Sequence, residues 1–173
     1  GDDVVIPVPY WVSYPEIVAL LGGEPVPVVT TMASGFKLTP EQLEKAITPK
    51  TKWLIFNSPS NPGGHTYNPG EMDDLSYALE RFPDVWVCSD EIYEKLIYGK
   101  TRFISFAALS EDAFKRTLTL NGFSKAYAMT GWRIGWVAGP RDLVQALDTL
   151  LSQSAGNCCS VSQAAAAAAL NGD

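Results

Sequence analysis

The chain has 173 residues, of which 46% are hydrophobic and 18% are charged, a composition typical of one folded domain of ordinary size. This composition excludes an intrinsically disordered chain. Its 13 basic and 19 acidic residues give a net charge of −6, so binding to a phosphate backbone has no electrostatic support and no nucleic-acid partner is expected. The longest apolar stretch, residues 164–170, is far shorter than the ~20 residues of a membrane-spanning helix, so we expect a soluble protein with no membrane partner.

Three cysteines and a single histidine leave little scope for disulfides or a metal site. The adjacent Cys158 and Cys159 could pair only through a strained ring, so a reducing compartment, the cytoplasm, is expected. His65 has no cysteine or carboxylate at a metal-ligand spacing, so no metal is expected, and it is interpreted as a structural or surface residue. The chain begins with Gly1 rather than Met, and two aspartates lead at once into the apolar run of residues 4–6, which suggests a piece of a longer protein.

Short apolar runs of strand length alternate with segments of helical period along the chain. The predicted strands are residues 4–8, 25–29, 53–56, 85–88, 117–120 and 134–138. The predicted helices are residues 14–21, a helix that starts at Pro40 behind the N-cap Thr39, residues 69–82 behind the N-cap Asn68, residues 140–152 and residues 160–170. We expect the leucines of residues 140–152 to face a core, and the alanine-rich last helix to be closely packed. This alternation indicates an α/β domain with a mostly parallel sheet and helices on both faces.

Polar residues follow four of the predicted strands, where an open parallel sheet binds its ligands. They lie in residues 57–64, 89–93, 121–125 and 126–135. Lys125 stands among apolar neighbours that could desolvate its amine and make it a nucleophile toward carbonyls, although most lysines are simply exposed. Asp90, at the end of a buried strand, either needs a cationic partner or caps the turn at Glu91.

Three further residues have both a functional and a structural interpretation. Arg133 could present its guanidinium to a phosphate or form a structural ion pair. Asn61 could contact a ligand or simply belong to a turn, and Trp11 could stack on a planar ring or pack in the core. Together, a lysine, an acid, an arginine, an amide and an aromatic ring are what an aldehyde cofactor with a pyridine ring and a phosphate requires.

In order and spacing, four sequence windows resemble those of the class I aminotransferases of the aspartate aminotransferase family, enzymes of fold type I that use pyridoxal 5′-phosphate (PLP). The windows are residues 9–15, 57–64, 89–93 and 124–135. Within the family, the sequences of these windows most resemble those of bacterial-type aspartate and plant-type prephenate aminotransferases. The resemblance covers nearly the whole chain and implies that residues 1–173 are the central part of the large, PLP-binding domain, without its N-terminal segment and its C-terminal small domain.

The resemblance also implies a role for each candidate residue. Lys125 would hold PLP as a Schiff base and move a proton during a ping-pong transamination between an amino acid (aspartate, glutamate or an aromatic or prephenate type) and a 2-oxo acid. Asp90 would keep the pyridine nitrogen protonated, and Tyr93 and Asn61 would hydrogen-bond the phenolic oxygen. Ser124 and Arg133 would hold the phosphate, and Trp11 would stack on the ring.

The same resemblance implies a homodimer when the protein is full length, in the cytoplasm or, for a plant or algal source, in a plastid. The isolated chain is expected to be inactive. The sequence departs from the family at Gly63, often Thr, and at Gly122, often Ser or Thr. Two alternatives remain open: a PLP-dependent lyase, decarboxylase or synthase on the same fold, and an aminotransferase-like sensor domain of a transcription regulator.

Overall fold

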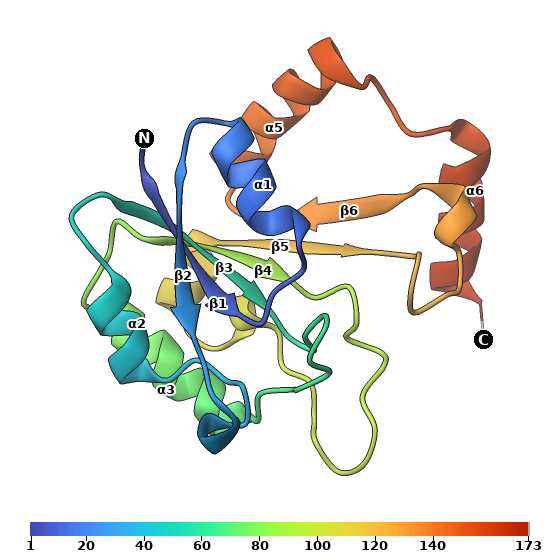
Figure 1. The fold of residues 1–173 in the computed structure, drawn as a ribbon. Coiled ribbons are helices and arrows are strands. Elements are labelled where there is room, and N and C mark those ends of the chain that lie inside the picture. The colour runs from blue at the N-terminus through green and yellow to red at the C-terminus, as the bar shows by residue number, and fades with distance from the viewer. Residues whose placement is uncertain (173) are drawn as a thin grey trace.

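A six-stranded sheet forms the centre of the computed structural model, which describes residues 1–172 (Figure 1). Its strands lie in the order β2-β1-β3-β4-β5-β6. All neighbouring pairs are parallel except β5 and β6, which are antiparallel. The strands are β1 (Asp3–Val8), β2 (Glu24–Val29), β3 (Thr51–Asn57), β4 (Trp86–Asp90), β5 (Thr117–Gly122) and β6 (Gly135–Ala138). All six predicted strands are therefore confirmed to within about three residues at each end.

The α-helices are α1 (Ser13–Leu20), α2 (Pro40–Ala46), α3 (Pro69–Leu79), α4 (Glu111–Arg116), α5 (Arg141–Ser154) and α6 (Ser160–Asn171). Both predicted N-caps are confirmed. The hydroxyl of Thr39 accepts from the Gln42 backbone N–H, and the side-chain oxygen of Asn68 accepts from that of Glu71. In both helices the side chain three residues on reaches back to the cap, which completes a capping box.

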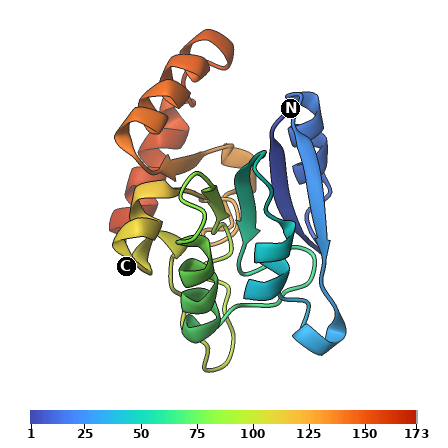
Figure 2. The same ribbon diagram turned by 90° about the vertical axis from the view of Figure 1, so that its left-hand side faces the viewer.

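Helices lie on both faces of the sheet, as predicted, but the two faces differ in how much they bury (Figure 2). The larger core joins the sheet to α2 and α3, and it includes the fully buried Leu43, Leu54, Phe56 and Leu75. On the other face a small cluster sits under α1. One face of the sheet is therefore well covered by α2 and α3, whereas the cluster buried on the other face lies under the single short helix α1.

The sequence missed one helix and misjudged the surroundings of two. Helix α4 was not predicted because its six residues make less than two turns and bury few apolar side chains. The expectation that α5 buries its leucines is wrong, since Leu150 and Leu151 are 65% and 49% exposed. The expectation of close packing for α6 is also wrong, because only Ser162 and Ala166 are buried. Neither helix packs extensively on another element of residues 1–172.

Within the same residues, no helix is both long and apolar enough to cross a membrane.

Candidate functional site

A cleft of about 330 Å³ opens at the carboxyl ends of the central strands. Four strands feed it: β1 leads to Trp11, β3 to Asn61, β4 ends at Asp90, and β5 leads to Ser124. All seven candidate residues from the sequence line this one cleft: Trp11, Asn61, Asp90, Tyr93, Ser124, Lys125 and Arg133. Five more side chains complete the lining: Tyr14, Ile92, Leu120, Asn121 and Thr130. The volume lies in the range of about 300–1,000 Å³ that is common for small-molecule sites.

Two hydrogen bonds fix the Asp90 carboxylate in the cleft wall. Its Oδ2 accepts from the Tyr14 hydroxyl at 2.6 Å, and its Oδ1 accepts from the Ile92 backbone N–H at 3.2 Å. Burial and the neighbouring Asp90 charge raise the pKa of Tyr14, so this hydroxyl stays protonated and donates. Asp90 therefore caps its turn with one oxygen and is oriented by a buried phenol through the other. Asp90 forms no ion pair among residues 1–172, so of the two alternatives left open by the sequence the described chain shows the turn cap.

Asn57, the last residue of β3, joins the strand ends to one another. Its Nδ2 donates to the Asp90 carbonyl oxygen at 2.9 Å, and its Oδ1 accepts from the Asn61 backbone N–H at 2.8 Å. Asn57 and Asp90 are direct neighbours in the parallel pairing of β3 and β4. One amide thus sets the position of Asn61 relative to Asp90.

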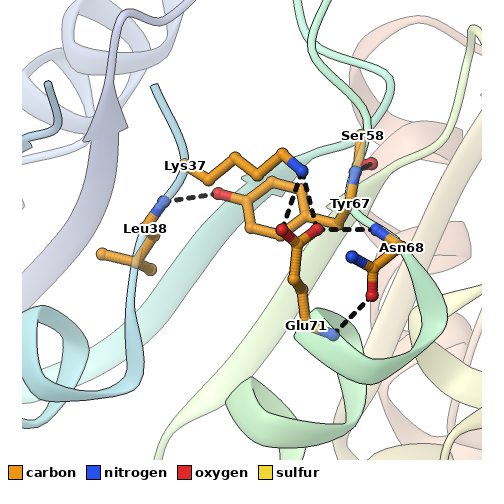
Figure 3. Close-up of polar contacts among 6 residues, drawn as sticks. All are labelled: Lys37, Leu38, Ser58, Tyr67, Asn68 and Glu71. Atoms are coloured by element: carbon orange, nitrogen blue, oxygen red, sulfur yellow. Dashed lines mark hydrogen bonds and ion pairs between the residues drawn. The ribbon is translucent and has the colours of Figure 1, made fainter. Parts of the chain in front are cut away.

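The loop that carries Asn61 is also held at its far end, as Figure 3 shows. The Tyr67 hydroxyl accepts from the Leu38 backbone N–H at 2.7 Å, and the Lys37 ammonium bridges both Glu71 oxygens at 2.9 and 2.7 Å. Glu71 in turn accepts from the Asn68 backbone N–H at the start of α3. Burial raises the pKa of Tyr67, so this hydroxyl is protonated. These contacts pin the loop to the connection between β2 and α2.

Lys125 also lines the cleft, and its side chain is exposed. Its Nζ is 5.6 Å from the centre of the Tyr93 ring, which places the amine and the phenol on the same opening. The expectation that apolar neighbours desolvate this amine is wrong for the described chain. The rings of Phe123 and Tyr127 pack in a tilted arrangement with their centroids 5.3 Å apart, and Phe123 is buried, while the Lys125 side chain is exposed.

A tight turn after Lys125 brings Arg133 back to the cleft. The Thr130 hydroxyl donates to the Ser124 carbonyl oxygen at 3.0 Å, and the Arg133 guanidinium donates to the Thr130 carbonyl oxygen at 3.0 Å. Arg133 adopts a left-handed backbone conformation with φ 49°, which is unusual for a residue other than glycine. It forms no ion pair within residues 1–172, so its charge is available to an anion.

Trp11 lies on the cleft edge rather than in the core. It is 42% exposed, and its ring meets that of Tyr14 edge to face at 5.4 Å. Much of the indole is therefore accessible to a planar ligand.

The structure gives physical reasons for the two departures from the family pattern. A Cβ at Gly63 would lie 2.5 Å from Nδ1 of His65, so the imidazole takes the space that a side chain at position 63 would need. A Cβ at Gly122 would meet Gly135 Cα at 3.1 Å and the Ile134 carbonyl oxygen at 3.2 Å, where β5 and β6 approach closely. Both glycines are therefore explained by close contacts.

The residues present fit a cofactor of the PLP type. The cleft offers an amine, a fixed carboxylate, a phenol and an unpaired guanidinium, which match an aldehyde, a pyridine nitrogen, a phenolic oxygen and a phosphate. Asn121, also in the lining, has a buried Nδ2 with no partner among the described residues, a donor that a ligand could satisfy. No group of three or more His, Cys, Asp or Glu side chains in residues 1–172 could hold a metal ion.

Sequence reasoning missed three residues that shape the site: Tyr14, Asn57 and Asn121. Asn57 and Asn121 fall in the polar windows after their strands, a signal that was available but gave them no role. Tyr14 falls in the window of residues 9–15, but it too was given no role. Its partner Asp90 is 76 positions away, and only the folded chain brings the two together.

Comparisons with known proteins agree with this geometry. The family model described as "Aminotransferase class I and II" matches residues 1–173. The aspartate/prephenate aminotransferase of Cereibacter sphaeroides is 56% identical over 99% of this chain, which covers 43% of that protein.

Solved structures give the same result. The aspartate aminotransferase of Rhizobium meliloti superposes with a TM-score of 0.98 at 49% identity, over 100% of this chain and 43% of that one. The aromatic aminotransferase of Pyrococcus horikoshii superposes with a TM-score of 0.95 at 40% identity, over 100% of this chain and 46% of that one. The chain thus spans less than half the length of the relatives it matches.

Proposed function

We propose that this chain, which belongs to the aminotransferase class I and II family, is the cofactor-binding part of an enzyme that moves an amino group from an amino acid to a 2-oxo acid. Enzymes of this family depend on PLP, which supplies an aldehyde and an electron-withdrawing ring when bound. The observation that carries the proposal is the convergence of seven candidate residues, from four strand ends, on a single cleft.

Each residue then has a task that its surroundings suit. The exposed amine of Lys125 would hold the cofactor covalently at its aldehyde carbon and would carry a proton to and from the substrate α-carbon. Asp90, oriented by Tyr14, would hold its carboxylate toward the pyridine nitrogen and keep that nitrogen protonated.

The remaining residues bind and orient the cofactor. Tyr93 and Asn61 would donate to the phenolic oxygen, and Trp11 would pack on the ring face. Ser124 and the unpaired guanidinium of Arg133 would hold the phosphate, which suits the preference of arginine for charge-assisted contacts to phosphate.

The substrates are an amino acid of the aspartate, glutamate or aromatic and prephenate type and a matching 2-oxo acid. The names of the relatives support both groups, since one is an aspartate/prephenate and another an aromatic aminotransferase. We further propose that residues 1–173 form only part of the large domain, that the full-length protein is a homodimer, and that it works in the cytoplasm. The free thiols of Cys88, Cys158 and Cys159 suit a reducing compartment.

A donor and acceptor panel on the full-length protein tests the reaction. A transaminase must form the new amino acid and the new 2-oxo acid in equal amounts and give parallel lines in double-reciprocal plots, as a ping-pong enzyme does. A lyase or decarboxylase would release ammonia or carbon dioxide without a 2-oxo acid acceptor, and a sensor domain would bind PLP without turnover. Lys125→Ala is the control and should remove all activity.

A further inference from the structure

The carboxylate of Glu91 lies beside the cleft but outside it, and the proposed reaction does not use it. It is only 4% exposed, although it follows Asp90 directly in the chain. A buried carboxylate is costly unless its oxygens are hydrogen-bonded, so its surroundings show what keeps it there. Burial raises the pKa of Glu91, while the hydrogen bonds to it act in the opposite direction.

Three donors converge on a single oxygen of this side chain. Glu91 Oε1 accepts from the Ser89 hydroxyl at 2.9 Å, from the Ser105 hydroxyl at 2.9 Å and from the Phe106 backbone N–H at 3.0 Å. Ser89 belongs to β4, whereas Ser105 and Phe106 come from the far end of the segment that leaves this strand. The carboxylate therefore ties the two ends of that segment together.

The tied segment, residues 94–105, is the yellow-green loop that extends away from the sheet after β4 in Figure 1. Its tip is exposed, including Lys95, Lys100 and Arg102. Phe106, just beyond it, is 1% exposed and belongs to the larger core. One end of the loop is thus anchored in the core and the other at the strand end.

Tyr93 sits in the turn from which this loop starts. The Glu94 N–H donates to the Glu91 carbonyl oxygen at 2.9 Å, and the Leu96 N–H donates to the Tyr93 carbonyl oxygen at 2.8 Å. These short backbone contacts make the Tyr93 turn continuous with the base of the loop. A loop released at Ser105 would leave this turn held on one side only.

We propose that Glu91 is a positioning residue, whose buried carboxylate clamps the base of the 94–105 loop to strand β4 and thereby holds Tyr93 in the cleft. This inference rests on the proposed function only where it concerns the cofactor. The clamp itself is a property of the chain and can be measured without any ligand.

The test is a tryptic digest of the full-length protein without PLP, with each cleavage site followed by mass spectrometry. In Glu91→Ala we expect cleavage after Lys95, Lys100 and Arg102 to become at least about tenfold faster, because three donors lose their acceptor. Lys50 and Arg81, exposed and far from the loop in sequence, report on global unfolding and should be unchanged. PLP affinity, measured by titration, should fall at least about fivefold in the same variant.

Glu91→Gln is the matched variant. Because all three donors use one oxygen, an amide with its oxygen in the same place can accept them all, so Gln should restore slow loop cleavage and PLP affinity. Ser105→Ala removes a single donor and should make tryptic cleavage in the loop about two- to threefold faster. Ser110→Ala removes a cap from α4 without touching Glu91 and should not open the loop.

Several outcomes overturn the clamp. One is unchanged loop cleavage in Glu91→Ala. Another is loop cleavage in Glu91→Gln that is as fast as in Glu91→Ala. Faster loop cleavage with unchanged PLP affinity would show that the position of Tyr93 does not depend on the loop. If Glu91→Ala unfolds and cleavage after Lys50 and Arg81 also becomes faster, the decision passes to Ser105→Ala, and unchanged loop cleavage in that variant contradicts the proposal. A wild-type protein that binds no PLP would refute the proposed function, while the digest would still decide the clamp.

Discussion

The acidic and the basic residues of the cleft are held in different ways. We call Asn57, Asp90 and Tyr14 the acid side of the cleft, and Lys125 and Arg133 the lysine side. On the acid side, Asn57, Asp90 and Tyr14 are joined by direct hydrogen bonds between strand ends and α1. On the lysine side, Lys125 and Arg133 are exposed and take part in no ion pair of residues 1–172. The acid side is organised before any ligand arrives, whereas the charges on the lysine side are left to be satisfied by what binds. Preorganised charge is what stabilises a transition state most effectively, so substitutions of Asp90 and Tyr14 should lower the rate more than the cofactor affinity, whereas Arg133 should contribute mainly to affinity.

The largest expected effect comes from removing the acid itself. Asp90→Ala in the full-length protein should leave PLP covalently attached to Lys125 but slow removal of the α-proton by roughly 10³-fold or more, because the pyridine nitrogen loses the charge that keeps it protonated. Rapid-mixing absorbance measurements with a saturating amino acid would follow that step. Asp90→Glu should keep more activity, since the charge remains. Turnover of Asp90→Ala within about tenfold of wild type would make Asp90 a structural cap only.

The isolated 173-residue chain should bind PLP more weakly than the full-length protein. The chain covers 43% of one relative, and if residues 1–173 form only part of the large domain, as proposed, contacts from the rest of the protein to the cofactor would be lost. The absence of two charge-assisted hydrogen bonds, worth about 1.5–3 kcal/mol each, would weaken PLP binding by roughly 100-fold or more. Titration of both proteins with PLP, followed by absorbance, measures the difference. Tight stoichiometric binding by the isolated chain, abolished in Lys125→Ala, would contradict this expectation.

Loosening the acid side without removing its charge should have a moderate effect. Tyr14→Phe deletes the 2.6 Å hydrogen bond to Asp90 and little else. A hydrogen bond to a charged group contributes about 1.5–3 kcal/mol, so kcat should fall by roughly 10- to 100-fold if that energy is expressed in the transition state. Tyr77→Phe, on an exposed ring of α3, is the matched control and should be silent. Equal kcat values for the two variants would show that Tyr14 does not orient the acid.

The fold and the cleft also show which features can be predicted from the sequence and which cannot. Apolar runs and cap residues such as Thr39 and Asn68 predict the elements because strand and helix periods are local properties. They do not predict whether Leu150 has a covering partner, since periodicity indicates an apolar face but not what packs on it. In the same way, strand ends predict which residues share the cleft, but the pairing of Tyr14 with Asp90 and the exposure of Lys125 depend on contacts between distant segments.

A smaller effect is expected at Gly63, because a side chain at this position would occupy the same space as the His65 ring. Gly63→Ala should destabilise the protein by about 1–3 kcal/mol because the new Cβ must displace the His65 ring. His65→Ala empties that space, so the double variant should recover, with a coupling energy of about 1 kcal/mol in urea unfolding. Gly70→Ala adds the same atom where its nearest neighbour is 3.4 Å away and serves as the control. Additive effects of the Gly63 and His65 substitutions would mean that the two residues are independent.

The smallest expected effect is the titration of His65. Burial, and then the positive charge of Lys37, lower the pKa of His65 below its usual value of about 6.5. The folded state therefore binds this proton less readily than the unfolded state, and protonation favours unfolding. The free energy of unfolding should fall as the pH drops below about 6.5, and this contribution should level off once the pH is below the pKa of the folded state. Urea unfolding of wild type and His65→Gln between about pH 8 and 5.5 isolates the contribution, because the other titrating groups are common to both proteins. Wild type should lose stability relative to the Gln variant as the pH falls, and a constant or opposite difference would show that the imidazole is not held neutral by its surroundings.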